Sequence, residues 1–285
     1  MKIFLALGKM RRGASSQRIK RFLRNDIQKI IFRYGFMIKR YLLLGIFLCG
    51  AAAVEAQTYQ NDNLTFVRIK YSSGKFSYGF RLRFQLWDSW EVDYPTAEEN
   101  FLRGLKEITR VPINEQALAV RLTDPQLFNY AFAYMLEVGF MQLSPGEADS
   151  LGEWCLRGGF LMIDDFHGSA QWENFSEEFS RVFPGRQPVE LKPDHPIFHC
   201  YFDFDRYPQV PGLAAIYRNS TYEYDGRYPH CRGLFDDNGR LMVLINFNVD
   251  LGDSWEHAAD PRYPEYYSMM GYRLGVNYVI YALTH

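Results

Sequence analysis

Two clusters of polar residues in this 285-residue chain could do chemistry, and each follows an apolar run. One cluster comprises Asp164, Asp165 and His167, and the other comprises Asn248, Asp250 and Asp253. Adjacent carboxylates repel each other, so their occurrence side by side indicates a structural or functional role. Carboxylates at this kind of position act as general acids or bases, hold metal ions or recognise hydroxyl groups. We predict catalytic roles for the first cluster and ligand binding for the second. In the alternative, one aspartate caps a helix while the other faces water.

Three further residues are candidate ligand contacts. Arg68 and Tyr71 lie at the end of the first predicted strand, where Arg68 could bind an anion or pair with an acid. His195 stands four residues before His199, a spacing that suits a metal on a helix, but Pro196 between them favours a structural turn. The sequence has no Gly-x-Ser-x-Gly elbow and no phosphate-binding glycine motif. We therefore predict no metal set and no cofactor.

The elements that must position these residues alternate between strands and helices. Period-two or continuous apolar patterns predict strands over residues 64–71, 80–86, 118–122, 132–138, 160–163 and 241–247. Helices are predicted after capping boxes at Thr96 and Ser144, over residues 169–183 and over residues 263–283. Asp237-Asn238-Gly239 indicates a hairpin turn, and residues 184–233 show no periodicity. This alternation predicts an α/β domain with a mostly parallel sheet and helices on both faces, a three-layer αβα sandwich.

The first 56 residues differ in charge from the rest of the chain. They contain 12 of the 32 basic residues and 2 of the 33 acidic ones, which leaves residues 57–285 with a formal charge of −11. This charge argues against nucleic acid or an anionic membrane as the main partner. Residues 37–56 read as a signal peptide with cleavage after Ala56, and residues 1–36 as a non-native or disordered extension. We expect a single exported domain, periplasmic or secreted, with no membrane span after cleavage; a membrane anchor is the alternative.

Export would place three cysteines, Cys155, Cys200 and Cys231, in an oxidising compartment. Cys200 and Cys231 both lie in the stretch without periodicity, so a disulfide between them is one interpretation. The other is that all three thiols are unpaired and partly buried. The sequence leaves both interpretations open.

Several motifs spread over residues 62–285 carry a family resemblance. They are Phe66-Val67-Arg68-Ile69-Lys70-Tyr71, Asp93-Tyr94-Pro95, Arg121-Leu122-Thr123-Asp124-Pro125, Gly158-Gly159-Phe160-Leu161, Asp194-His195-Pro196-Ile197-Phe198 and Asn248-Val249-Asp250-Leu251-Gly252-Asp253. Together they resemble a bacterial family of unknown function, DUF4159. Their order is also similar to the ThuA-like proteins, which share the class I glutamine amidotransferase-like sandwich, and this resemblance implies a flavodoxin-like fold. Amidotransferases carry a nucleophilic cysteine after the strand that matches residues 160–163. Asp164-Asp165-Phe166 stands there in this chain, so we expect no glutaminase activity.

These observations support three hypotheses of function. The first is an exported, non-catalytic binding or accessory module for a small polar or carbohydrate ligand. The second is a sugar or cell-wall hydrolase with Asp164 or Asp165 as general acid/base, with or without a metal. The third is an interaction module with an envelope protein partner, because members of the resembled family occur beside membrane proteins. Convergence of Asp165, His167 and Asp250 within hydrogen-bonding or metal distance in one pocket would favour the enzyme. Side chains that point apart or pair with arginines would favour binding or a structural role. Side chains alternate along a strand, so we expect Asp165 to face a crevice and Asp164 to face the N-terminus of the helix that follows.

Overall fold

The computed structural model describes residues 63–73 and 88–285. The chain divides into two units between Glu55 and Ala56, and all of the described residues belong to the second unit. The predicted extension, the signal peptide and the strand over residues 80–86 lie outside the described ranges. Within those ranges, no helix combines the length and the apolar character that crossing a membrane requires.

A seven-stranded sheet forms the centre of the unit, with the strand order β2-β1-β3-β4-β7-β6-β5. The strands are β1 (Val67–Lys70), β2 (Leu118–Arg121), β3 (Phe132–Leu136), β4 (Phe160–Asp164), β5 (Val189–Glu190), β6 (His230–Phe235) and β7 (Leu241–Phe247). The first five strands of the order run parallel, whereas β6 and β5 are antiparallel additions at one edge. The predicted mostly parallel α/β sheet is therefore confirmed. Its parallel part follows the doubly wound order of flavodoxin-like folds.

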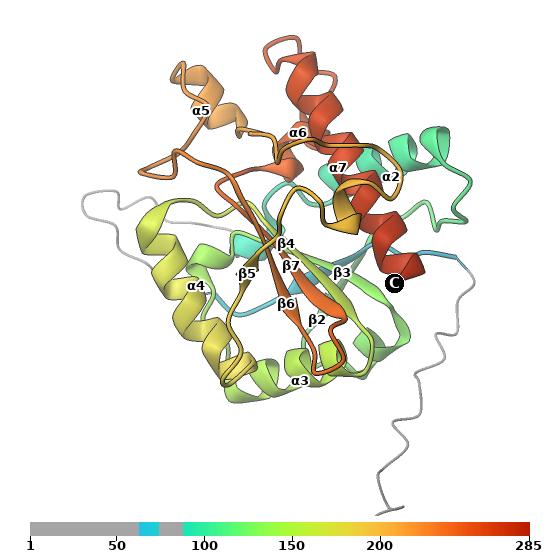
Figure 1. Ribbon diagram of the computed structural model, residues 1–285, viewed down its shortest axis with the longest axis vertical. Coiled ribbons are helices and arrows are strands. Elements are labelled where there is room, and N and C mark those ends of the chain that lie inside the picture. The colour runs from blue at the N-terminus through green and yellow to red at the C-terminus, as the bar shows by residue number, and fades with distance from the viewer. Residues whose placement is uncertain (1–62, 74–87) are drawn as a thin grey trace, which may run out of the picture. The chain divides into compact units, whose positions relative to one another are not determined.

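Helices cover both faces of this sheet (Figure 1). The α-helices are α2 (Thr96–Ile108), α3 (Pro145–Leu156), α4 (Gly168–Val182), α5 (Leu213–Tyr217), α6 (Leu251–Glu256) and α7 (Glu265–Thr284). Short 3-10 helices span η1 (Ser89–Glu91), η2 (Pro125–Asn129), η3 (Val138–Phe140) and η4 (Pro196–Phe198). Side chains of β3 explain the layers, because Phe132 and Tyr134 enter the core beside α2, α6 and α7, whereas Ala133 and Met135 enter the core beside α3 and α4.

One of the two predicted capping boxes is confirmed and the other is wrong. Ser144 caps α3, and its hydroxyl accepts from the Glu147 amide while the Glu147 carboxylate accepts from the Ser144 amide. Helix α2 instead begins after Pro95 with no side-chain cap, and Thr96 is its first residue. Glu98, the residue two positions further on, pairs with Arg68 in the interior. Glu99, the acid of the predicted box, is exposed, so the carboxylate that points inward at this helix start belongs to the ion pair and not to a cap.

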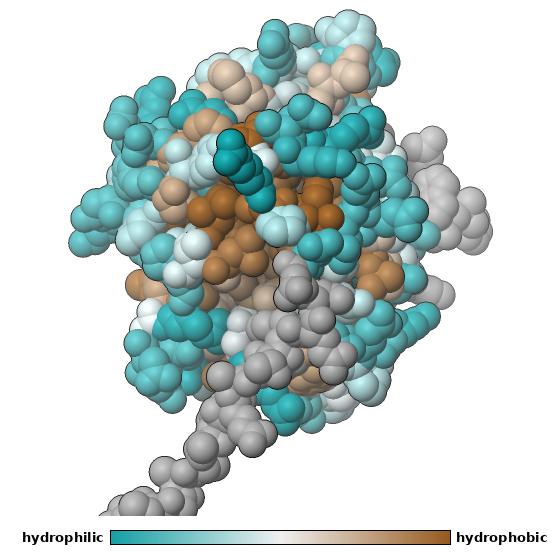
Figure 2. Space-filling model, turned by 90° about the vertical axis from the view of Figure 1, so that its right-hand side faces the viewer, coloured by the Kyte–Doolittle hydropathy of each residue, from teal (hydrophilic) through white to brown (hydrophobic). Residues whose placement is uncertain are grey.

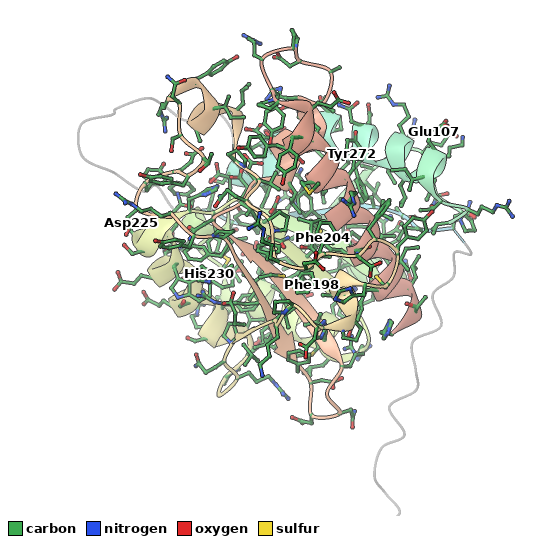
Figure 3. All side chains as sticks on the ribbon, turned by 45° about the horizontal axis from the view of Figure 1, so that its top comes forward. Glu107, Phe198, Phe204, Asp225, His230 and Tyr272 are labelled. Atoms are coloured by element: carbon green, nitrogen blue, oxygen red, sulfur yellow. The ribbon has the colours of Figure 1, made fainter. Side chains whose placement is uncertain are left out.

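The stretch 184–233 contributes more to the core than its pattern suggested. It supplies β5, η4, α5 and most of β6, and the β6–β7 hairpin turns where Asp237-Asn238-Gly239 predicted it. Phe198 and Phe204 of this stretch are buried and lie within the molecule, whereas Asp225 lies at its periphery (Figure 3). Apolar residues that are spaced irregularly along a winding segment fill the core without producing a periodic signal.

The predicted disulfide between Cys200 and Cys231 is wrong, because Cys155, Cys200 and Cys231 are all free. The Cys200 thiol lies 3.1 Å from the Asn277 carbonyl oxygen, and Cys231 is buried within β6. The second interpretation, three unpaired thiols that are at least partly buried, describes the structure.

The side of the molecule that carries α2 and α7 is mostly hydrophilic, with an apolar area near its centre (Figure 2). Exposed apolar side chains on these two helices include Ile108 and Leu283. The hypothesis of an interaction module stays a prediction.

Candidate functional site

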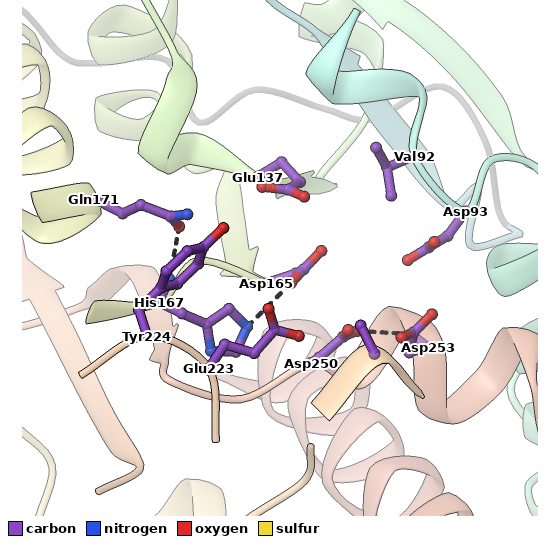
Figure 4. A pocket seen from close by; sticks show the side chains of 11 residues that line it. Val92, Asp93, Glu137, Asp165, His167, Gln171, Glu223, Tyr224, Asp250 and Asp253 are labelled. Atoms are coloured by element: carbon purple, nitrogen blue, oxygen red, sulfur yellow. Dashed lines mark hydrogen bonds and ion pairs between the residues drawn. The ribbon is translucent and has the colours of Figure 1, made fainter. Parts of the chain in front are cut away.

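An acidic cavity of about 180 Å³ lies at the carboxyl ends of β3, β4 and β7 (Figure 4). Six acidic residues line it: Asp93, Glu137, Asp165, Glu223, Asp250 and Asp253. His167, Gln171 and Tyr224 are among the other lining residues, and no lysine or arginine of the described ranges lines the cavity. The carboxyl edge of an open parallel sheet is where ligand sites form in such folds. This cavity is therefore the candidate site.

Asp165 and His167 form a close pair inside the cavity. The Asp165 Oδ1 and His167 Nε2 atoms are 3.1 Å apart, and the two residues are only 8% and 5% exposed. The Gln171 side-chain oxygen accepts from the His167 backbone amide at 2.7 Å, which anchors the turn that carries the ring. Within the described ranges, His167 Nδ1 has no hydrogen-bond partner. The pair is held in place and keeps one ring nitrogen free.

Several cavity residues have a left-handed backbone. The φ angles are 63° at Asp93, 52° at Glu137, 50° at Asp165 and 49° at Tyr224. Residues other than glycine in this region are uncommon, and such conformations gather at functional sites where the surrounding structure imposes them. The Glu137 amide donates to the Asp165 carbonyl at 3.0 Å, so two of these turns are tied together. The turns direct the carboxylates of Glu137 and Asp165, at the ends of β3 and β4, and of Asp93, in a connecting segment, toward one space.

Asp164 and Asp165 diverge as expected, but Asp164 faces a different helix from the predicted one. Asp164 is fully buried, and its Oδ2 accepts from the Leu251 and Gly252 amides of α6 and from the Tyr134 hydroxyl. Helix α4, which follows β4, is capped instead by Asn248, whose side-chain oxygen accepts from the Gly168 amide at 2.9 Å. Asp164 at the end of β4 thus caps α6, the helix that follows β7, and Asn248 after β7 caps α4, the helix that follows β4. We call this arrangement the crossed caps.

Arg68 lies outside the cavity lining and is engaged in the interior. It is fully buried, and its Nε donates to Glu98 Oε1 at 2.5 Å. Its Nη1 donates to the carbonyl oxygens of Trp90 and Val92 at 2.8 Å each. Of the two roles left open for Arg68, pairing with an acid is the one observed. The guanidinium also fixes the segment that leads to Asp93, so it supports the cavity without lining it.

Tyr71 and His195 are likewise not brought into the cavity. The Tyr71 hydroxyl donates to the carbonyl oxygens of Leu136 and Glu137 at 2.8 and 3.0 Å, which fixes the turn that carries the Glu137 carboxylate. His195 caps η4, where its Nδ1 accepts from the Ile197 amide at 3.3 Å. A structural turn was the alternative for His195, and that is where it lies.

Of the predicted site residues, Asp165, His167, Asp250 and Asp253 line the cavity together. Sequence reasoning missed the acids supplied by loops, Asp93, Glu137 and Glu223. Glu137 fell inside the strand predicted over residues 132–138, whereas β3 ends at Leu136. Asp93 belongs to the motif Asp93-Tyr94-Pro95, which carries part of the family resemblance and no chemical signal of its own. That motif was the one available signal for it.

The electrostatics of the cavity favour neutral forms. Burial, followed by the charges of Asp164 and Asp253, raises the pKa of Asp165 well above its ordinary value. Burial is also the main reason that the pKa values of Asp93, Glu137 and Asp250 are raised, with neighbouring carboxylates second in each case. Burial lowers the pKa of His167. Without a counter-charge the acids cannot all ionise, so the cavity holds either protons or a cation at neutral pH.

Comparison with known proteins places the chain in a family. The model described as "Domain of unknown function (DUF4159)" matches residues 65–283, most of the chain, and the protein belongs to this family. Among curated proteins, none matches the sequence.

Proposed function

We propose that this protein is a hydrolase of small polar, carbohydrate-type substrates in which Asp165 is the general acid/base. The observation that carries the proposal is the Asp165–His167 pair, 3.1 Å apart within an acidic cavity that Asp250 also lines. Asp165 and His167 lie within hydrogen-bonding distance of each other and Asp250 lines the same cavity, and this arrangement supports an enzyme over a non-catalytic binding module.

The chemistry needs one group that gives a proton to the leaving oxygen and a second that activates water or stabilises positive charge. Asp165 suits the first task, because its raised pKa lets it keep a proton closer to neutral pH than an ordinary aspartate does. Glu137 would take the second task in its ionised form; it lines the same cavity, and its backbone amide donates to the Asp165 carbonyl oxygen. His167, kept neutral by its lowered pKa, orients the Asp165 carboxyl group.

The charge of the cavity narrows the substrate class. Six acids without a lining lysine or arginine repel phosphate esters and acidic sugars. Neutral or amine-bearing sugars fit the same surroundings, because carboxylates accept hydrogen bonds from hydroxyl and ammonium groups. The volume of about 180 Å³ admits a small group rather than a long chain. We therefore propose action on a single sugar unit of a glycan.

The proposed location is outside the cytoplasm, at the cell envelope, where cell-wall glycans are available. It rests on the predicted signal peptide over residues 37–56. N-terminal sequencing of the exported protein tests it, and a mature chain that begins at Gln57 is the expected result. A mature chain that begins before residue 41 contradicts it.

Release of reducing sugar from neutral and amine-bearing glycans, including peptidoglycan, tests the function. The full chain is compared with Asp165→Asn, His167→Gln and the control Asp149→Asn, which removes an exposed acid of α3. We expect Asp165→Asn to lower kcat about 10²–10⁴-fold, the range for a lost general acid or base, and the control to match the natural chain. Full activity in Asp165→Asn overturns the assignment. A melting-temperature rise with sugar but no turnover supports the binding module instead.

A further inference from the structure

We propose that the cavity binds one oxygen-preferring divalent cation through the carboxylates of Asp93, Asp250 and Asp253. Each of these residues offers a carboxylate oxygen, and the three oxygens lie within 4.8 Å of one another. The inference deepens the proposed function and rests on it, because the cation would share the cavity with the Asp165–His167 pair. Its positive charge would hold a substrate hydroxyl and leave Asp165 to move the proton.

The three ligand residues are held by ordered structure. Asp250 caps α6, and its Oδ1 accepts from the amide of Asp253, which lies in the first turn of that helix, at 2.7 Å. Asp93 follows the segment that the buried Arg68 fixes through the Val92 carbonyl. The ligand oxygens therefore come from a helix start and an anchored turn, so binding would require little reordering of the chain.

Two glycines let these carboxylates approach the backbone. A Cβ atom on Gly252 would lie 2.5 Å from Asp93 Oδ2, and one on Gly212 would lie 2.6 Å from Asp250 Oδ2. Any side chain at either position would displace a proposed ligand oxygen. Glycine thus preserves the close arrangement of the three acids.

A second observation points to a missing ligand in the same space. The Asp165 side chain is 11% exposed, and His167 is the hydrogen-bond partner of its Oδ1. Its carboxylate points into the cavity between Glu137 and Asp93 (Figure 4). Asp93 Oδ2 is buried without a partner among the described residues. Buried polar atoms without partners are unfavourable, and a cation would satisfy several carboxylate oxygens at once.

The donor set indicates which cation fits. The three proposed ligands supply oxygen only, and carboxylate oxygens prefer Ca²⁺, Mg²⁺ and Mn²⁺ over softer metals. A second acidic set, Asp253, Glu256 and His257, shares Asp253 but includes a nitrogen donor. In that set His257 Nε2 already pairs with Asp253 and Glu256 at 3.2 Å each. In the inner set, Asp93 Oδ2 is buried without a partner among the described residues, whereas Asp253 Oδ2 accepts from the Leu213 amide at 2.6 Å. We assign the cation to the inner set because of the unpartnered Asp93 oxygen.

Titration of the chelator-treated full chain with Mn²⁺ alone, followed by electron paramagnetic resonance, tests the site. We expect one saturable Mn²⁺ per chain at pH 7.5 and displacement by Ca²⁺. Asp93→Asn should weaken binding at least tenfold, whereas Glu256→Gln and the control Asp149→Asn should bind as the natural chain does. Mn²⁺ should raise the melting temperature more at pH 7.5 than at pH 5, because protons compete for the carboxylates.

Three results would overturn the cation site: no saturable binding, unchanged binding in Asp93→Asn, or weakening by Glu256→Gln alone. The metal titration needs no substrate, so the two proposals fail separately. Hydrolysis that persists in chelator without Mn²⁺ binding refutes the cation and leaves the general acid in place. Saturable Mn²⁺ binding by a chain that hydrolyses no glycan refutes the hydrolase and leaves the cation site in place.

Discussion

Two neighbouring carboxylates, Asp164 and Asp165, are both buried, yet they belong to different regions of the molecule. Asp164 accepts three hydrogen bonds on one oxygen and connects β4 to the start of α6 and to Tyr134 of β3. We call such buried residues, which hold elements together outside the cavity, the framework. Asp165 has a single side-chain partner, His167, and shares its cavity with five other acids. Burial of a carboxylate therefore does not mark a site by itself. Burial raises the pKa of Asp164 to about 7 despite its donors, so the two residues differ in the number of groups that depend on them, three for Asp164 and one for Asp165. Substitutions in the two regions should differ accordingly.

The largest effect is expected in the framework, at the buried ion pair. Arg68→Met should lower the free energy of unfolding by about 3–5 kcal/mol, because it leaves Glu98 buried without its partner. Urea denaturation measures the change. Adding Glu98→Leu to the same chain should restore most of the loss, since both charges are then gone. A double variant as unstable as Arg68→Met would show that the pair is not the cause.

A smaller loss is expected at the framework aspartate. Asp164→Ala should cost about 2–3 kcal/mol, because it leaves the Leu251 amide, the Gly252 amide and the Tyr134 hydroxyl without their acceptor. Asp165→Ala should cost less, since it removes one hydrogen bond and relieves repulsion. Thermal unfolding of both variants compares the two regions directly. The comparison fails if Asp165→Ala proves the more destabilising change.

The smallest effect is expected in the cavity and depends on pH. The pKa of Asp165 is raised in the folded state. The contribution of Asp165 to the free energy of unfolding is therefore fully present below the ordinary pKa of an aspartate, and it is lost as pH rises through the folded-state pKa. In chelator, Asp165→Asn should melt close to the natural chain below about pH 4, the ordinary pKa of an aspartate, and above it at pH 8, by an amount equivalent to at least about 1 kcal/mol. Asp149→Asn should show no such trend. A gain confined to the acidic end of this range would contradict the expected sign.

The parallel sheet was predictable because its strands are buried on both faces. Runs such as the one that became β4 are apolar throughout, and only a covered strand accommodates them. Strand β6 was not predictable in the same way. Its sequence mixes His230, Arg232 and Gly233 with apolar residues, and its strand conformation depends on pairing with β7. Local pattern therefore indicated the interior of the sheet but not its antiparallel edge.

The candidate site was predictable where a strand end supplies it. Asp165 and Asp250 follow apolar strands, and the topology of a parallel sheet brings such ends to one edge. Asp93 and Glu223 come from connecting segments whose course depends on long-range contacts, such as the one between Arg68 and Val92. Nothing in the residues around Arg68 shows that Glu98, thirty positions later, neutralises it. The order of residues along the chain could not show which distant residues would contact each other in the folded protein.

The crossed caps have a consequence for the order in which the molecule assembles. The first amides of α4 and α6 find their acceptors, Asn248 and Asp164, only after β4 and β7 lie side by side. Asp250 supplies a local acceptor for the Asp253 amide, but the Gly168, Leu251 and Gly252 amides depend on the opposite strand, so these three should gain protection from hydrogen exchange in the same step. That step also brings Asp165 and Asp250 to the same edge of the sheet. The part of the cavity that the two strand ends form thus arises together with the helix starts.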